Sequence, residues 1–69
     1  MQRGLGVKTA QTEIFDKDGN LTKIEVYLST GVHLFDVLWD ARDEQTHENR
    51  VAFREWTNRL IKRHYHEVS

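Results

Sequence analysis

Histidine is the residue of this sequence whose chemistry is most readily used at neutral pH, as a metal ligand or as an acid and base. The chain has four histidines and no cysteine, so a metal site would have to use imidazole and carboxylate ligands. His64 and His66 lie two residues apart near the end of an expected helix, where such a pair does not share a face, and His47 lies about five turns earlier. His33 lies in an expected strand. We therefore predict no metal site.

Acidic side chains could act as calcium ligands or as a general acid and base, but their spacing favours neither role. Asp16 and Asp18 resemble the start of a calcium-binding loop, yet Gly19 follows Asp18 directly and no glutamate stands at the twelfth position of such a loop. The sequence has no nucleophile elbow, Walker loop or zinc-protease motif, and 69 residues leave little room for a closed pocket. We predict a non-enzymatic protein without a cofactor. The acids considered for acid–base work are Asp40, Asp43, Glu44 and Glu48.

Charge is distributed unevenly along a chain whose formal net charge is -1. Residues 36–48 hold five acids against one arginine, whereas residues 50–66 hold five bases against one glutamate. Bases near the C-terminal end of a helix suit the negative end of its dipole, so a solvated helix is the simpler interpretation. The alternative is a nucleic-acid-binding surface, which ranks second because the acids would repel a phosphate backbone nearby. Its residues would be Arg59, Lys62 and Arg63.

The length of 69 residues corresponds to a single domain, which we expect to fold because 38% of its residues are hydrophobic and its charges are mixed. Such a small core has a thin margin of stability, and no disulfide can reinforce it, so a partner is the expected source of further stability. No apolar run approaches the roughly 20 residues needed to span a bilayer, and the start lacks the apolar core of a secretion signal. We therefore expect a cytoplasmic protein without a membrane partner.

Residues 9–39 are expected to form three strands joined by tight turns, after a flexible lead at residues 1–8. An Asp-Gly pair in the first turn is a strong hairpin signal, because glycine adopts positive φ without steric cost. Residues 21–29 alternate in polarity, which is typical of a half-buried strand, and residues 32–39 form a third strand with apolar residues on both faces. An antiparallel β-meander follows.

Residues 46–65 are expected to form one helix. Thr46 is a suitable N-cap, and Glu48 in the first turn favours the positive end of the helix dipole. One face of this helix would lie on the sheet, with Trp56 as its anchor. That face comprises Ala52, Phe53, Trp56, Leu60 and His64.

One face of the sheet must be covered by the helix, because a bare three-stranded sheet of this length is marginal in water. On the third strand, Phe35, Val37 and Trp39 form an uncharged set, and His33 shares their face, whereas the alternate set includes Asp36. We therefore expect the uncharged set to face the core. The core residues expected from the other two strands are Ala10, Ile14, Ile24, Val26 and Leu28.

Two apolar groups have no place in this core, one on the outer face of the sheet and one on a second stripe of the helix. They either flank a broad helix–sheet contact, half-buried, or bind another chain. The residues of these two candidate protein-binding groups are Tyr27, Leu34 and Leu38 on the sheet, and Val51, Ile61 and Tyr65 on the helix.

The sequence thus predicts an α+β fold in which a three-stranded antiparallel β-meander packs against one C-terminal α-helix, in the order βββα. The expected function is that of a small binding or regulatory module that acts through protein–protein contacts, with a protein partner or with a second copy of itself. Nucleic-acid binding through the basic end of the helix is the alternative.

Overall fold

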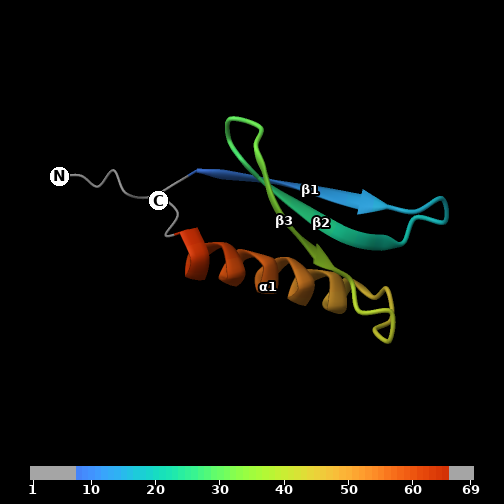
Figure 1. Cartoon of the computed structure of the whole chain (residues 1–69). Coiled ribbons are helices and arrows are strands. Elements are labelled where there is room, and N and C mark those ends of the chain that lie inside the picture. The colour runs from blue at the N-terminus through green and yellow to red at the C-terminus, as the bar shows by residue number, and fades with distance from the viewer. Residues whose placement is uncertain (1–7, 66–69) are drawn as a thin grey trace.

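The computed structural model describes residues 8–65 and has four elements. The strands are β1 (Thr9–Phe15), β2 (Leu21–Leu28) and β3 (His33–Leu38), and they are followed by one helix, α1 (His47–Tyr65). The strands form one antiparallel sheet in the order β1-β2-β3, and α1 lies along one face of it (Figure 1). This is the predicted βββα arrangement of the α+β class. The lead expected at residues 1–8 and the helix-end residue His66 lie outside the described residues, apart from Lys8.

Both strand connections are short turns that depend on glycine. In the first turn, the Asp16 carboxylate accepts hydrogen bonds from the backbone N–H groups of Asp18 at 2.8 Å and Asn20 at 2.9 Å. Gly19 has a φ of 82°, and Gly31 in the second turn has a φ of 103°, so both occupy a region that other residues rarely adopt. The hairpin signal at Asp18-Gly19 therefore predicted the first turn correctly.

The start of α1 also follows the sequence prediction. The hydroxyl of Thr46 accepts a hydrogen bond from the Asn49 N–H at 3.1 Å, and the Thr46 carbonyl accepts one from the Arg50 N–H at 3.0 Å. Thr46 is thus the N-cap, and Glu48 lies in the first turn where its charge suits the helix dipole.

The core lies between β2, β3 and α1, and it is small. Ile61 of α1 is 1% exposed and packs with Ile24 and Val26 of β2. Thr57 is fully buried, and its hydroxyl donates a hydrogen bond to the Phe53 carbonyl at 2.9 Å, so that burial leaves no polar atom unpaired. Among residues 8–65, the buried side chains are Leu21, Ile24, Val26, Val37, Thr57 and Ile61.

The helix faces the sheet with a different side from the one predicted. Trp56 is 43% exposed and Ala52 and His64 are exposed, whereas Thr57 and Ile61 are buried. The prediction of Trp56 as the core anchor was wrong, because α1 is turned by about 100°, the angle between successive residues. Thr57, a small and fully buried residue, is on the side of α1 that faces the sheet. The two aromatic side chains Phe53 and Trp56 lie to one side of it around the helix.

β1 presents the opposite face from the one predicted. Glu13 pairs with Ile24 and Gln11 pairs with Val26, so these polar residues lie on the face that α1 covers. Ala10 and Ile14, which were expected in the core, therefore lie on the outer face. The physical reason is that α1 supplies polar partners for the inner residues, as the ion pair and amide contacts described below show.

A β-bulge between β2 and β3 reverses two further predictions. The register shifts between Val26, which pairs with Phe35, and Tyr27, which pairs with His33. Leu34 is the extra residue and packs against the core, while His33 lies on the outer face beside Tyr27. In the part of β3 that follows Leu34 the predicted alternation holds, because Phe35 packs on the core and Val37 is buried.

Candidate functional site

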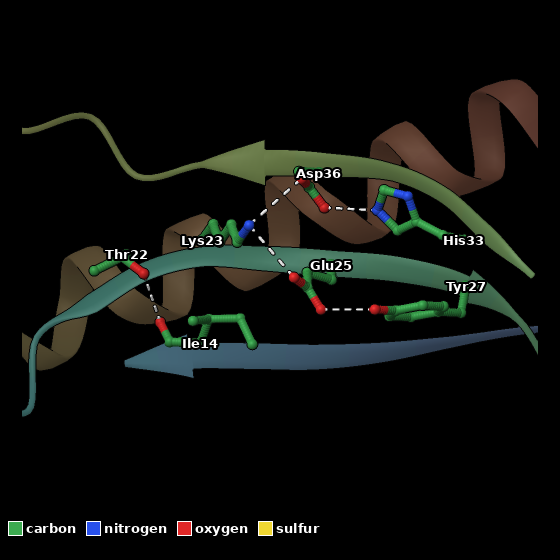
Figure 2. Close-up of polar contacts among 7 residues, drawn as sticks. All are labelled: Ile14, Thr22, Lys23, Glu25, Tyr27, His33 and Asp36. Carbon is green, nitrogen blue, oxygen red and sulfur yellow. Dashed lines mark hydrogen bonds and ion pairs between the residues drawn. The ribbon is translucent and has the colours of Figure 1, made fainter. Parts of the chain in front are cut away.

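The outer face of the sheet, which points away from α1, carries a chain of paired polar side chains (Figure 2). The Tyr27 hydroxyl donates a hydrogen bond to Glu25 at 2.7 Å. The Lys23 ammonium lies 3.3 Å from a Glu25 oxygen and 3.6 Å from an Asp36 oxygen, and His33 lies 2.8 Å from the other Asp36 oxygen. These five residues of β2 and β3, here called the outer-face network, pair with one another along each strand, and the Lys23–Asp36 contact joins the two strands.

The contacts of the outer-face network favour the ordinary charge states of Glu25, Asp36, Lys23 and Tyr27. The Tyr27 hydrogen bond and then the Lys23 charge lower the pKa of Glu25, and the same hydrogen bond raises the pKa of Tyr27. The His33 contact and then the Lys23 charge lower the pKa of Asp36, while Glu25 and Asp36 raise the pKa of Lys23. The acids are held ionised and the base is held protonated, which is the opposite of what proton transfer near neutral pH requires.

The structure separates the sheet residues that were predicted to bind protein together. Tyr27 belongs to the outer-face network, and Leu34 packs against the core at the bulge. Leu38 is 72% exposed at the end of β3. They therefore do not form one apolar patch on the outer face.

The predicted second stripe of α1 takes part mainly in the helix–sheet contact. Ile61 is in the core, and Val51 is half-buried. Tyr65 is also half-buried, with its ring 6.0 Å from that of Phe35. The structure thus uses this stripe inside the domain.

A groove opens instead between the end of β3 and the first half of α1. Its volume is about 270 Å³, and five of its eight lining side chains are apolar or aromatic, beside three polar ones. Leu38 and Trp56 are the exposed large apolar side chains in it, at 72% and 43%. We call it the Trp56 groove, and it is lined by Leu38, Trp39, Asp40, Asp43, Asn49, Ala52, Phe53 and Trp56.

The aromatic side of the Trp56 groove is fixed by contacts of Trp39. The Trp39 ring meets the Phe53 ring edge-on, with 5.1 Å between centroids. Its indole N–H donates a hydrogen bond to the Asp43 carbonyl at 3.1 Å. The side chain of Trp39, which was predicted inside the core, is half-buried and forms a wall of the groove.

The loop between β3 and α1 is held to the start of β2 and to the first turn of α1. The Gln45 side chain accepts from the Leu21 N–H and donates to the Leu21 carbonyl, each at 2.9 Å. The Arg50 guanidinium donates to the side-chain oxygen of Gln45 at 3.1 Å, and the Asn49 side-chain amide donates to the backbone carbonyl of Glu44 at 2.9 Å. The groove is therefore formed before any ligand arrives.

The loop gives the Trp56 groove an acidic rim. The Asp40 carboxylate binds the Arg42 guanidinium, with 2.9 Å between Oδ2 and Nη2. Within residues 8–65, the carboxylates of Asp43 and Glu44 make no ion pair. Asp40 first and then Asp43 raise the pKa of Arg42, so this arginine offsets part of the acidic charge that stands beside the exposed apolar surface.

An exposed stripe continues from the groove along α1. Ala52, Trp56, Arg59 and Arg63 lie within about 60° of one another around the helix axis, and all four are exposed. The predicted nucleic-acid residue Lys62 is also exposed but lies about 100° from Arg63 around the axis. In the described part of the chain, neither arginine of this stripe makes an ion pair.

The opposite side of α1 meets β1 through polar contacts. Both terminal oxygens of Glu13 accept hydrogen bonds from the Arg54 guanidinium, at 2.6 Å and 3.1 Å, and the Arg54 contact lowers the pKa of Glu13. Gln11 donates to the Asn58 side-chain oxygen at 2.6 Å. These contacts fix the rotation of the helix and so leave Trp56 at the surface.

Sequence reasoning missed the Trp56 groove because it placed both tryptophans in the core. A signal was present in the polar residues Gln11 and Glu13, which alternate with Ala10 and Ile14 and have matching partners at Asn58 and Arg54. Pairing Gln11 with Asn58 and Glu13 with Arg54 would have indicated the rotation of α1 that exposes Trp56.

Comparisons with protein-family models, with curated proteins and with solved structures find no match to this chain. Among the described residues, no helix is long and apolar enough to cross a membrane, and no three potential metal ligands among histidine and acidic side chains gather in one place. The expected cytoplasmic location stays a prediction. The Trp56 groove, the exposed stripe and the outer-face network are therefore the candidate functional features of the described residues.

Proposed function

We propose that the protein is a non-enzymatic binding module that holds another protein surface in the Trp56 groove. The observation that carries this proposal is that Leu38 and Trp56, two of the four exposed large apolar side chains among the described residues, line the same groove. Isolated exposed apolar residues are ordinary, but neighbouring ones around a hollow typify interaction sites. Tryptophan is also among the residues that contribute most to binding at protein interfaces.

The composition of the groove favours a protein surface as its ligand. An apolar side chain of the bound protein would cover Trp56 and Phe53, and a basic side chain beside it would meet the Asp43 carboxylate. Because Trp39 and Gln45 hold the walls in place, binding costs little ordering of the groove.

Capture of binding proteins by the tagged chain tests this proposal. The chain is exposed to lysate of its native cells, and bound proteins are quantified by mass spectrometry. Leu38→Asp should remove the specifically bound proteins, because it places a charge at the apolar edge of the groove. The substitution is tolerable in the fold, since Leu38 is 72% exposed and pairs across the strands with Lys23.

Phe15→Asp is the matched control, because Phe15 is also exposed and apolar but lies at the end of β1, outside the groove. It should retain the bound proteins. Circular dichroism checks that both variants are folded. Equal binding by wild type and folded Leu38→Asp, or equal loss in both variants, would refute the groove as the binding site.

Nucleic-acid binding is a second candidate function, favoured by the position of Trp56 between exposed residues Ala52 and Arg59 on the stripe that ends at Arg63. Bases of a single strand can stack on an exposed tryptophan while arginines contact phosphates. The acidic rim weakens this candidate, because it lies beside the same tryptophan.

Titration of a labelled oligothymidine with the protein tests the second candidate. Three phosphate contacts, by Arg59, Lys62 and Arg63, predict a log–log salt slope of about -2 on single strands. We expect weak binding that disappears at physiological salt. Tight binding that Trp56→Ala and Arg63→Glu abolish, but that Phe15→Asp retains, would place nucleic acid ahead of protein as the ligand.

A further inference from the structure

We infer that the partner in the Trp56 groove is a second copy of this chain, bound with the two α1 helices antiparallel and related by a twofold axis near Trp56. This inference rests on the proposed function of the groove as a protein-binding site. In such an interface the same surface serves on both subunits, so the surface must complement itself. The Trp56 groove and the exposed stripe have that property in the distribution of their charges.

Opposite charges lie on either side of Trp56. Asp43 and Glu44 lie toward the N-terminal end of α1, and Arg59 and Arg63 lie toward its C-terminal end. Among the described residues these four side chains make no ion pairs. In a second copy related by a twofold axis, the acids at one end of this surface would face the arginines at the other end, so that opposite charges meet.

The helix spacing brings these charges together when the helices are antiparallel. Asn49 precedes Trp56 by seven residues and Arg63 follows it by seven, so each lies about 10 Å from Trp56 along the axis. A twofold axis at Trp56 therefore places Arg63 of one copy opposite Asn49 of the other. Asn49 binds the Glu44 carbonyl at 2.9 Å and lines the groove with Asp43, so Arg63 reaches this acidic loop in the other copy.

The twofold operation creates this contact twice, once at each end of the interface. At the centre, Trp56 of each copy lies against the groove of the other and covers Leu38. A parallel arrangement of the helices would instead bring like charges together. The antiparallel arrangement is thus the one that the charges select.

The size of the core gives a physical reason for association. Among residues 8–65 only five apolar side chains are buried, and a chain this short often depends on further burial supplied by a partner. Pairing would remove Trp56 and Leu38 from water in both copies.

Sedimentation equilibrium of the full chain over a wide concentration range tests the inference. The wild type should approach twice its single-chain mass of 8.2 kDa as concentration rises. Trp56→Ala, and separately Ala52→Glu, should leave it monomeric. Ala52 is exposed on the stripe, so its substitution tests the interface even if the tryptophan variant proves unstable.

Charge exchange makes the test specific for the antiparallel arrangement. Arg63→Glu should weaken association by about tenfold, because it removes an attraction and adds a repulsion at both ends of the interface. Adding Asp43→Arg to the same chain should restore it, since every copy then carries the exchanged pair. Lys62→Glu is the matched control, with the same change of charge at the same helix end but off the stripe, and it should associate like the wild type.

Each contrary result has a definite meaning. Equal weakening by Lys62→Glu and Arg63→Glu, or no rescue by the added Asp43→Arg, would overturn the antiparallel arrangement. A wild type that stays monomeric at millimolar concentration would overturn the dimer. If that monomer still captures another protein through Leu38, the proposed function survives; if it captures nothing that depends on Leu38, both fail.

Discussion

The outer-face network and the Trp56 groove are two surfaces of this domain that differ in what they leave unsatisfied. The network contains four charged or titratable groups and a tyrosine, each paired with a neighbour on β2 or β3 (Figure 2). The groove has Trp56 and Leu38 exposed to solvent and Asp43 without an ion pair in the described part of the chain.

This difference shows why a concentration of charged residues is a weak guide to a binding site. Covering the network would remove water from groups that are already paired, which costs free energy without forming better contacts. Covering the groove would remove apolar surface from water and supply a partner for Asp43. The less conspicuous surface in the sequence is thus the better candidate for binding.

The largest predicted effect concerns which side of α1 belongs to the core. Ile61→Ala should lower the free energy of unfolding by about 3 kcal/mol, because it opens a cavity beside Ile24 and Val26. That loss is comparable with the whole stability expected of a domain this small. Trp56→Ala should cost about 1 kcal/mol, because the side chain is 43% exposed.

Urea denaturation followed by circular dichroism measures both changes, at a concentration low enough to keep the chain monomeric. The two substitutions form a matched pair, because both shorten an apolar side chain of α1, one on its buried side and one on its exposed side. If Trp56→Ala proved the more damaging, the tryptophan would belong to the core and the comparison between groove and network would fail.

A smaller effect is expected at the contact between β1 and α1. Glu13→Gln should lower the free energy of unfolding by about 1 kcal/mol at neutral pH, because it removes the charge from a two-bond contact with Arg54 that is partly open to solvent. Glu55→Gln is the control, since Glu55 is exposed on α1 and, among residues 8–65, has no ion pair. Equal effects of the two substitutions in urea denaturation would show that the Arg54 contact contributes nothing.

The Glu13 contact also predicts a pH dependence. Arg54 lowers the pKa of Glu13 in the folded protein below its ordinary value of 4.5, so the contact stabilises fully above that value. This stabilisation is lost as the pH falls through the folded pKa. The stability difference between wild type and Glu13→Gln, measured by urea denaturation at several pH values, should therefore narrow below about pH 4.5 and be constant above pH 6. A difference that is the same at pH 3 and pH 7 would contradict the assignment.

The smallest effect is expected on the outer face. Tyr27→Phe removes the hydroxyl that binds Glu25 and keeps the ring beside His33. Because the contact is only partly buried and Glu25 keeps Lys23 as a partner, the urea midpoint should change little, and association through the groove should not change at all. Loss of association in this variant, with the fold retained, would transfer the binding role to the outer face.

The locally determined parts of the fold could be predicted from the sequence. The Asp18-Gly19 turn and the Thr46 cap each depend on hydrogen bonds to residues within a few positions of themselves. The alternation of Ile24 and Val26 along β2 likewise needs no distant information. These features were predicted correctly for that reason.

The candidate site depended on contacts between distant residues and was predicted poorly. The phase of β1 is fixed by Glu13 and Arg54, which are 41 residues apart in the chain, and this pairing turns α1 and exposes Trp56. The bulge at Leu34 moves one residue across the sheet, which no local alternation indicates. Of the groove residues, only Leu38 was placed correctly by the alternation of polarity along β3, because it lies in the part of the strand where the register is regular.

The most direct test of the account is a map of the residues that change when the binding partner is added. Two-dimensional ¹H–¹⁵N NMR spectra of the labelled chain would be recorded free and saturated with that partner, which under the dimer proposal is the chain itself at high concentration. Binding through the Trp56 groove should give the largest shifts at the Trp56 indole N–H and at the amides of Leu38 and Ala52, with Glu25 and Tyr27 unchanged. Shifts centred on Glu25 and Tyr27, with the Trp56 indole unmoved, would contradict it.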